Sequence, residues 1–138
     1  MIAPDTSILV AGFDSTHPFS RQAIAALVDV RRDGRLVAHT IAETFAVLSA
    51  PGGPYPASPA IVVEYLSPLL ERDPIGLTPK RYPRAVAELV RLGVRGGAVY
   101  DGLIALAVRD AAGELVSLDR RAAKTYERVG VEHRIIAS

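Results

Sequence analysis

Cysteine is absent from the 138-residue chain, and histidine is scarce. Without cysteine the protein can form no disulfide bond and no zinc or iron–sulfur site with cysteine ligands. The three histidines, His17, His39 and His133, are scattered without the spacing of metal ligands. Any bound metal ion must therefore be coordinated mainly by oxygen atoms.

Long apolar runs are also missing. No stretch approaches roughly eighteen uninterrupted apolar residues, the length that a membrane span requires. The N-terminal segment MIAPDTSILV has no basic region and is interrupted by Asp5, which argues against a secretory signal. We therefore expect a soluble protein of the cytoplasm with no membrane segment. The length and the 49% hydrophobic content predict one compact domain over residues 1–138.

An excess of charge of either sign is lacking too. The chain has 16 Lys and Arg against 15 Asp and Glu, a formal net charge of +1. A nearly neutral chain is not driven onto nucleic acid by its overall charge, so any such binding must come from local patches. Only Lys80 and Lys124 are lysines, which leaves fourteen arginines. Arginine suits phosphate because it can bind bidentately, although a GC-rich genome is the simpler explanation of the bias.

Short apolar segments alternate with helical patterns along the chain. Strands are predicted at residues 1–4, 35–40, 74–77, 114–119 and 131–136. Helices are predicted at residues 19–32, 41–50, 60–72, 80–92, 100–111 and 120–130. Between two of them, the proline-rich stretch 51–59 predicts a stiff connector. The alternation indicates an α/β fold, with a mostly parallel sheet covered by helices on both faces.

Four acidic residues interrupt apolar patterns. Asp5 and Asp119 each close a short apolar strand at its carboxyl end, the edge at which ligands of parallel sheets collect. Glu43 lies on the same predicted helix face as apolar residues such as Val47, and Asp101 stands likewise in a nearly all-apolar helix. Both of these side chains are therefore expected to project from buried faces.

Taken singly, each acid has a simpler explanation. Asp5, Asp101 and Asp119 stand at or just before helical patterns, where aspartate often caps free N–H groups. Glu43 could pair with a buried arginine. Taken together, however, carboxylates close to one another in an apolar cleft repel and are costly to desolvate, so they require a cation.

An all-oxygen cluster suits Mg²⁺ or Mn²⁺. Such an ion would activate and orient a water molecule for phosphodiester hydrolysis, so no protein nucleophile is needed. The hydroxyls of Thr6 and Ser7 would then support the site by hydrogen bonding to a ligand or to a phosphate oxygen. The alternative for both residues is a role at the start of the following helical segment.

At this point the order and spacing of four segments, PDTSILV, AETFAVLS, YDGLIALA and LVSLDRRAAKTYERVGVE, resemble a PIN-domain ribonuclease over essentially the full length of the chain. The chain is most similar to the VapC toxins of bacterial toxin–antitoxin pairs. The resemblance implies that Asp5, Glu43, Asp101 and Asp119 form a Mg²⁺ site. It also places Ser7 at a supporting polar position and Ser117 where a threonine is common.

The resemblance further implies a five-stranded parallel sheet in the order 3-2-1-4-5, a homodimer, a small VapB-type antitoxin and an RNA substrate such as tRNA or rRNA. Many family members carry another acid shortly after the fourth, but this chain has Arg120 and Arg121 there. The sequence therefore leaves open whether the site binds one metal ion or two. Basic residues around the four acids must offset their negative charge before RNA can approach. The candidates are Arg81, Arg84, Arg95, Arg120 and Arg121.

Two other functions compete with this hypothesis. An aspartyl-phosphate phosphotransferase or receiver domain also places an aspartate at a strand end, but Asp5 has no acidic neighbour and Lys124 follows the wrong strand. A non-catalytic PIN-fold module could bind RNA or dimerise without cleaving anything. The four acids argue against this last function, because an inactive protein need not keep them.

Overall fold

The centre of the protein is a parallel three-stranded sheet in the order β1-β2-β3. The computed structural model describes residues 1–55 and 57–136, so residue 56 of the expected connector lies outside the described residues. The strands are Ile2–Pro4 (β1), Glu114–Ser117 (β2) and Glu132–Ile135 (β3). β2 lies between the other two and is parallel to both. Three of the predicted strands are thus confirmed.

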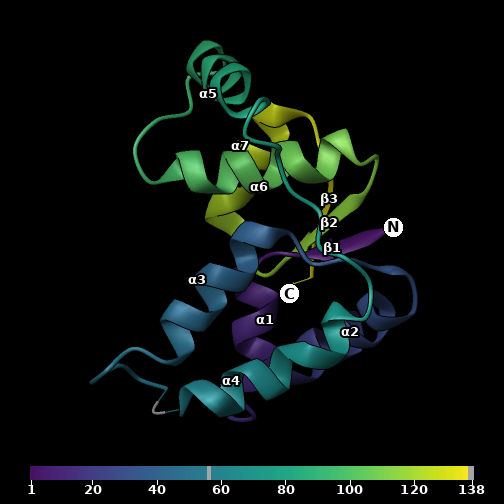
Figure 1. Ribbon diagram of the computed structural model, residues 1–138, viewed down its shortest axis with the longest axis vertical. Helices are drawn as coiled ribbons and strands as arrows, with labels where there is room; N and C mark the ends of the chain where they lie inside the picture. The colour runs from purple at the N-terminus through teal and green to yellow at the C-terminus, as the bar shows by residue number, and fades with distance from the viewer. Residues whose placement is uncertain (56, 137–138) are drawn as a thin grey trace.

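Helices cover both faces of this sheet (Figure 1). They are α1 (Thr6–Phe13), α2 (Ser20–Asp33), α3 (Ala38–Leu48), α4 (Pro59–Leu66), the 3₁₀ turn η1 (Ser67–Leu70), α5 (Tyr82–Arg91), α6 (Ala98–Asp110) and α7 (Arg120–Val129). Figure 1 shows α5, α6 and α7 on one side of the sheet and α1 to α4 on the other. Of the described helices, none is both long and apolar enough to cross a bilayer.

The sheet separates two apolar cores. Successive residues of a strand point to opposite faces, so Leu115 joins the core with α5, α6 and α7, whereas Val116 joins the core with α1, α2, α3 and α4. Ala3 of β1 lies in the first core and Ile8 of α1 in the second, and both are fully buried. This packing fixes the carboxyl ends of β1 and β2, where two of the candidate acids lie.

The five-stranded sheet expected from the resemblance is wrong. The two missing strands are reduced to isolated parallel bridges, Ile2↔Gly34 and Val37↔Ile75. The predicted strand 35–40 ends early because Ala38 begins α3, and the predicted strand 74–77 is reduced to Ile75, which bonds Leu36 and Ala38. Helix α1, which the sequence patterns did not predict, begins directly after Asp5.

Gly34 places β1 against the end of α2. A Cβ added to this glycine would lie 2.4 Å from the Ile2 carbonyl oxygen and 2.6 Å from the Val30 Cα. We predict that Gly34→Ala lowers the free energy of unfolding by about 1–3 kcal/mol, because these backbone atoms cannot yield as a side chain would. Urea denaturation measures this loss.

The matched control is Gly76→Ala, whose added Cβ would meet only the Ala38 Cβ at 3.4 Å. We expect this control to unfold within about 0.5 kcal/mol of the wild-type protein. Equal stabilities for the two alanine variants would contradict the close approach of β1 to α2.

Candidate metal centre

Asp5 lies buried at the junction of β1 and α1, with only 4% of its surface exposed. Its backbone N–H donates to the Val116 carbonyl oxygen at 2.9 Å, which fixes the junction against β2. Its side chain caps α1 by accepting the backbone N–H groups of Ser7 at 3.0 Å and Ile8 at 3.4 Å. The capping role considered for Asp5 is therefore confirmed, and it sets the carboxylate at the edge of the sheet.

Two hydroxyls complete the surroundings of Asp5. The Tyr126 hydroxyl of α7 donates to Asp5 Oδ2 at 2.7 Å, and the Ser7 hydroxyl donates to Oδ1. Burial raises the pKa of Asp5, and hydrogen bonds from Ser117, Ser7 and Tyr126 oppose this rise. The carboxylate is thus desolvated, but its negative charge is stabilised by donors.

Tyr126 is a site residue that the sequence did not indicate. Its side chain is fully buried, and its ring makes an edge contact with His133. In the sequence it is one of several residues on the buried face of α7, and nothing distinguishes it from the others. Its partner Asp5 is 121 positions away, a separation at which no local pattern connects two residues. The spacing of buried residues on α7 could have shown that Tyr126 faces the sheet, but not what it contacts.

Asp119 is the second acid at this edge. It caps α7 by accepting the backbone N–H groups of Arg121 at 2.9 Å and Ala122 at 3.4 Å, which confirms the capping role considered for it. Its own N–H donates to the Ser117 hydroxyl at 2.9 Å. Asp119 follows the end of β2 by two residues and is exposed.

The two serines connect the Asp5 carboxylate to the backbone N–H of Asp119. The Ser7 and Ser117 hydroxyl oxygens lie 3.4 Å apart, and the Ser7 hydroxyl also accepts the Leu118 N–H at 2.9 Å. A chain of hydrogen-bonding groups therefore runs from Asp5 through Ser7 and Ser117 to Asp119. This arrangement holds the ends of β1 and β2 at a fixed spacing.

Glu43 reaches the site from α3. The Thr6 hydroxyl, next to Asp5, donates to Glu43 Oε1 at 2.9 Å, and His39 Nε2 lies 3.8 Å from the same oxygen. The expectation that Glu43 projects from a buried face is wrong, because its side chain is 34% exposed and Val47, on the same face, is 41% exposed. The buried residues of α3 are instead Thr40, Thr44 and Leu48. The alternative that Glu43 pairs with a buried arginine is also wrong, because the basic side chain beside it is that of His39.

Asp101 lies in the first turn of α6, and the apolar residues below it, such as Ile104 and Val108, are buried as predicted. Gly97 occupies the N-cap, so capping does not explain this acid. Burial is the main cause that raises the pKa of Asp101 to about 6. The negative charges of Asp5, Asp119 and Glu43 raise it further, in that order. The fold therefore brings all four predicted acids into one electrostatic neighbourhood.

The donor set fits a hard divalent cation, because all four charged groups are carboxylates whose mutual repulsion a cation would relieve. In the described residues, however, no three Asp, Glu or His side chains are already grouped closely enough to hold a metal ion. The carboxylates thus interact through their charges without forming a closed cage.

Of the five candidate arginines, Arg121 lies at the site. It lines a hollow of about 580 Å³ together with Thr6, Ser7, Val10, His17, Phe19, Leu118 and Asp119. Arg120 precedes it at the start of α7. Arg95 is exposed in the loop that leads into α6, and Arg84 is exposed on α5.

Arg81 has a structural partner away from the four acids. Its Nε donates to Asp110 Oδ2 at 3.0 Å, and its Nη2 donates to Glu88 Oε2 at 3.3 Å. Asp110 ends α6, about 13 Å along the helix from Asp101 at the usual rise per residue. Arg81 therefore joins α5 to the far end of α6, and the structure does not bring it to the acids.

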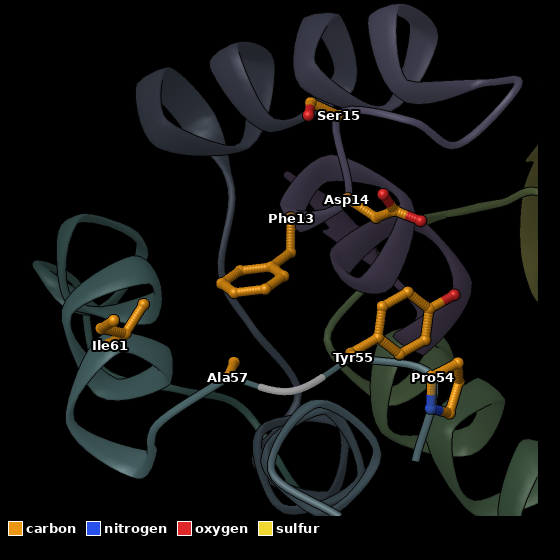
Figure 2. Close-up of a pocket in the computed structure, with 7 residues that line it drawn as sticks. All are labelled: Phe13, Asp14, Ser15, Pro54, Tyr55, Ala57 and Ile61. Carbon is orange, nitrogen blue, oxygen red and sulfur yellow. The ribbon is translucent and has the colours of Figure 1, made fainter. Parts of the chain in front are cut away.

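A second hollow, of about 360 Å³, lies between the end of α1 and the segment leading into α4 (Figure 2). The residues that line it are Phe13, Asp14, Ser15, Pro54, Tyr55, Ala57 and Ile61. Thr16 donates two hydrogen bonds to Asp14, which lower the pKa of this carboxyl. Asp14 is thus satisfied locally, and the hollow in Figure 2 lacks the coupled acids of the first site.

The raised pKa of Asp101 predicts a pH-dependent stability. Because the folded protein binds this proton more tightly than the unfolded chain, the contribution of Asp101 is present below about pH 4 and is lost as the pH rises through about 6. In EDTA at pH 7.5 we expect Asp101→Asn to melt about 2–5 °C above the wild type, with the difference fading toward pH 4.

Thermal melts across this pH range make the comparison, with Asp73→Asn as the control for an exposed acid. The control should show no such pH-dependent gain. A gain for Asp101→Asn that is the same at pH 4 and pH 7.5 would contradict the charge repulsion.

The Tyr126 hydroxyl predicts a second difference in stability. Removing it leaves Asp5 Oδ2 buried without this donor, so Tyr126→Phe should lower the free energy of unfolding at pH 7 by about 2 kcal/mol. The control is Tyr65→Phe, which removes a 2.6 Å bond to the uncharged Leu9 carbonyl oxygen and should cost about 1 kcal/mol. Urea denaturation of both variants decides the point, and a smaller loss for Tyr126→Phe than for Tyr65→Phe would argue against a charged acceptor.

Comparison with known proteins places the chain in a family. Residues 2–128 match the PIN domain. The chain is 37% identical over 136 residues to Ribonuclease VapC40 of Mycobacterium tuberculosis, covering 99% of each protein. It is 32% identical over 142 residues to Ribonuclease VapC27 of the same species, covering 99% of this chain and 97% of that one.

Two solved structures share the fold. The structure of FitAB bound to an IR36 DNA fragment matches with a TM-score of 0.74 and 16% identity, covering 98% of this chain and 94% of that one. The structure of FitAcB from Neisseria gonorrhoeae matches with a TM-score of 0.69 and 19% identity, covering 96% of each. With the four acids at the carboxyl edge of the sheet and the full-length similarity to two VapC ribonucleases, the chain belongs to the PIN-domain family, as a nuclease of the VapC type.

Proposed function

We propose that the protein is a Mg²⁺- or Mn²⁺-dependent endoribonuclease that acts in the cytoplasm as the toxin of a toxin–antitoxin pair. The observation that carries this proposal is the placement of four acids in one neighbourhood: Asp5 and Asp119 follow β1 and β2, Glu43 is hydrogen-bonded to Thr6 beside Asp5, and the charges of these three help to raise the pKa of Asp101. Carboxylates held in mutual repulsion by the fold are a binding site for a cation. The similarity to proteins named as ribonucleases supports RNA as the substrate.

In this proposal Asp5, Glu43, Asp101 and Asp119 hold the metal. When bound, the ion supplies an activated water and stabilises the charge that develops on the phosphate. The protein's own task is to hold its carboxylates in a fixed orientation. Thr6 performs it for Glu43 through the 2.9 Å hydrogen bond described above.

The Ser7 hydroxyl orients the Asp5 carboxylate, and Ser117 holds the backbone of Asp119 by accepting its N–H. Arg121, whose side chain lines the same hollow as Asp119, is placed to meet a phosphate that enters it. We propose Arg84, Arg95 and Arg120 as further phosphate contacts. Arg81 is a weaker candidate, because its guanidinium is already paired with Asp110 and Glu88.

We also propose a VapB-type antitoxin as a partner, and a homodimer. The antitoxin follows from the similarity to VapC proteins and to the FitAB fold. A surface that could receive a partner is the apolar hollow of about 350 Å³ between α3 and α4, lined by Ala38, Ile41, Ala42, Phe45, Val63, Leu66 and Leu70. The homodimer rests on the family resemblance alone.

We predict that the purified protein cleaves total RNA in Mg²⁺ or Mn²⁺, and that EDTA abolishes cleavage until the metal is restored. Asp5→Ala and Asp101→Asn should each lower the rate by more than about 100-fold, because even residues that only support metal ligands cost 10–100-fold. Cleavage rates are measured by gel electrophoresis of end-labelled RNA.

Asp14→Asn is the matched control, since Asp14 lines the other hollow and should leave cleavage unchanged. Metal-independent cleavage, or full activity in both site variants, would contradict the proposed centre. RNA binding without any cleavage would instead favour the non-catalytic module, and transfer of phosphate to Asp5 would favour the phosphotransferase.

A further inference from the structure

An aromatic pair lies beside the acids, and one of its members, His39, also approaches Glu43 at 3.8 Å. The rings of His39 and Tyr100 are stacked in parallel, with centroids 5.4 Å apart and an angle of 3° between their planes. His39 stands in the first turn of α3, one turn before Glu43, and Tyr100 directly precedes Asp101 in α6. The pair therefore joins the two helices that carry two of the four acids.

Tyr100 leaves much of its ring open. It is 53% exposed, whereas the rest of α6 from Gly102 to Val108 is buried. Within residues 1–55 and 57–136 its hydroxyl makes no hydrogen bond, so the surrounding structure does not use the polar end of this side chain. One face of the ring is supported by His39, which restricts its motion. The feature that it offers to a ligand is thus a fixed aromatic surface.

A fixed aromatic surface next to a phosphate-cleaving site matches one class of ligand. Proteins that read single-stranded RNA stack unpaired bases on aromatic side chains, and each such contact contributes about 1–3 kcal/mol. The chain has a formal net charge of only +1, so its overall charge contributes little to RNA binding. Stacking would supply affinity that does not depend on net charge.

We propose that Tyr100, backed by His39, is a nucleobase-stacking subsite that holds an unpaired base of single-stranded RNA beside the carboxylates. The proposal rests on the proposed ribonuclease function and extends it to how the RNA is positioned. The base continues the His39–Tyr100 stack from its open side, and its backbone then lies over the first turn of α6. Tyr100 is a binding residue in this arrangement and takes no part in the chemical step.

The test compares RNA with a backbone that has no bases. Fluorescence anisotropy measures binding of a randomised single-stranded RNA of about 12 nucleotides, a length within the usual site sizes, and of an abasic ribose–phosphate oligomer of the same length. Ca²⁺ replaces Mg²⁺ in the buffer to supply a hard cation that coordinates oxygen. We expect the wild type to bind the RNA about 10-fold more tightly than the abasic oligomer, which corresponds to about 1.4 kcal/mol.

Three variants isolate the ring of Tyr100. Tyr100→Ala should lose most of this preference while its affinity for the abasic oligomer stays the same, and Tyr100→Phe should keep the preference because it keeps the ring. Tyr82→Ala is the matched control, since Tyr82 is 40% exposed on α5 and is not part of the stacked pair. It should behave as the wild type.

A Tyr100→Ala variant that retains the full preference for bases overturns the subsite, and so does an equal loss in Tyr82→Ala. The two proposals fail in different ways. Binding that depends on Tyr100 in a protein that cannot cleave RNA would remove the nuclease proposal and keep the stacking site. Cleavage by a Tyr100→Ala variant with unchanged KM would instead remove the stacking site and keep the nuclease proposal.

Discussion

A buried carboxylate at the end of the first strand is the constraint from which the site follows. Removing a charge from water is costly unless hydrogen-bond donors compensate it, and only 4% of the surface of Asp5 is exposed. The compensation comes from the first turn of α1, from the Ser7 hydroxyl and from Tyr126. Because α1 and α7 pack on opposite faces of the sheet, Asp5 can be satisfied only when both layers are in place.

The other acids depend on the same junction. Thr6 and Ser7 follow Asp5 in the chain and reach Glu43 and Ser117, so one short segment contacts both α3 and the end of β2. Asp101 approaches from α6. Its pKa is raised first by burial and then by repulsion from the other three acids. The fold thus maintains an unfavourable arrangement of like charges, whose relief by a cation is the driving force of the proposed metal binding. Stability without metal and affinity for metal are linked through this arrangement.

The sequence singled out the four acids, whose role as metal ligands stays a prediction, but it did not indicate their surroundings. Asp5 and Asp119 follow apolar strands, and Asp101 belongs to a helix with an apolar pattern, so local patterns gave their positions in the fold correctly. Glu43 was found for a wrong reason, since α3 buries Thr40 and Thr44 where a hydropathy pattern favours Val47. The buried Thr40 hydroxyl donates to the Val37 carbonyl oxygen, whereas the buried Thr44 hydroxyl has no hydrogen-bond partner in the described part of the chain, and no pattern of apolar residues reports either.

Long-range contacts explain the remaining differences. The sheet has fewer strands than expected because α3 begins immediately after a single bridge at Val37, a boundary set by tertiary packing. Tyr126 and the stacked pair of His39 and Tyr100 were missed because each joins residues far apart in sequence. Such contacts decide how a site is held and what it receives, whereas the residue types alone indicate the chemistry.

The central claim is that four carboxylates form one electrostatic site for a divalent cation. Its most direct test is an NMR titration of the Asp101 side-chain carboxyl carbon between pH 3 and pH 8, without metal and with saturating Mg²⁺. The account predicts a midpoint at about 6 without metal and a much lower midpoint with Mg²⁺, because the bound cation competes with the proton. A midpoint near the ordinary value of 3.8 in both titrations would contradict it.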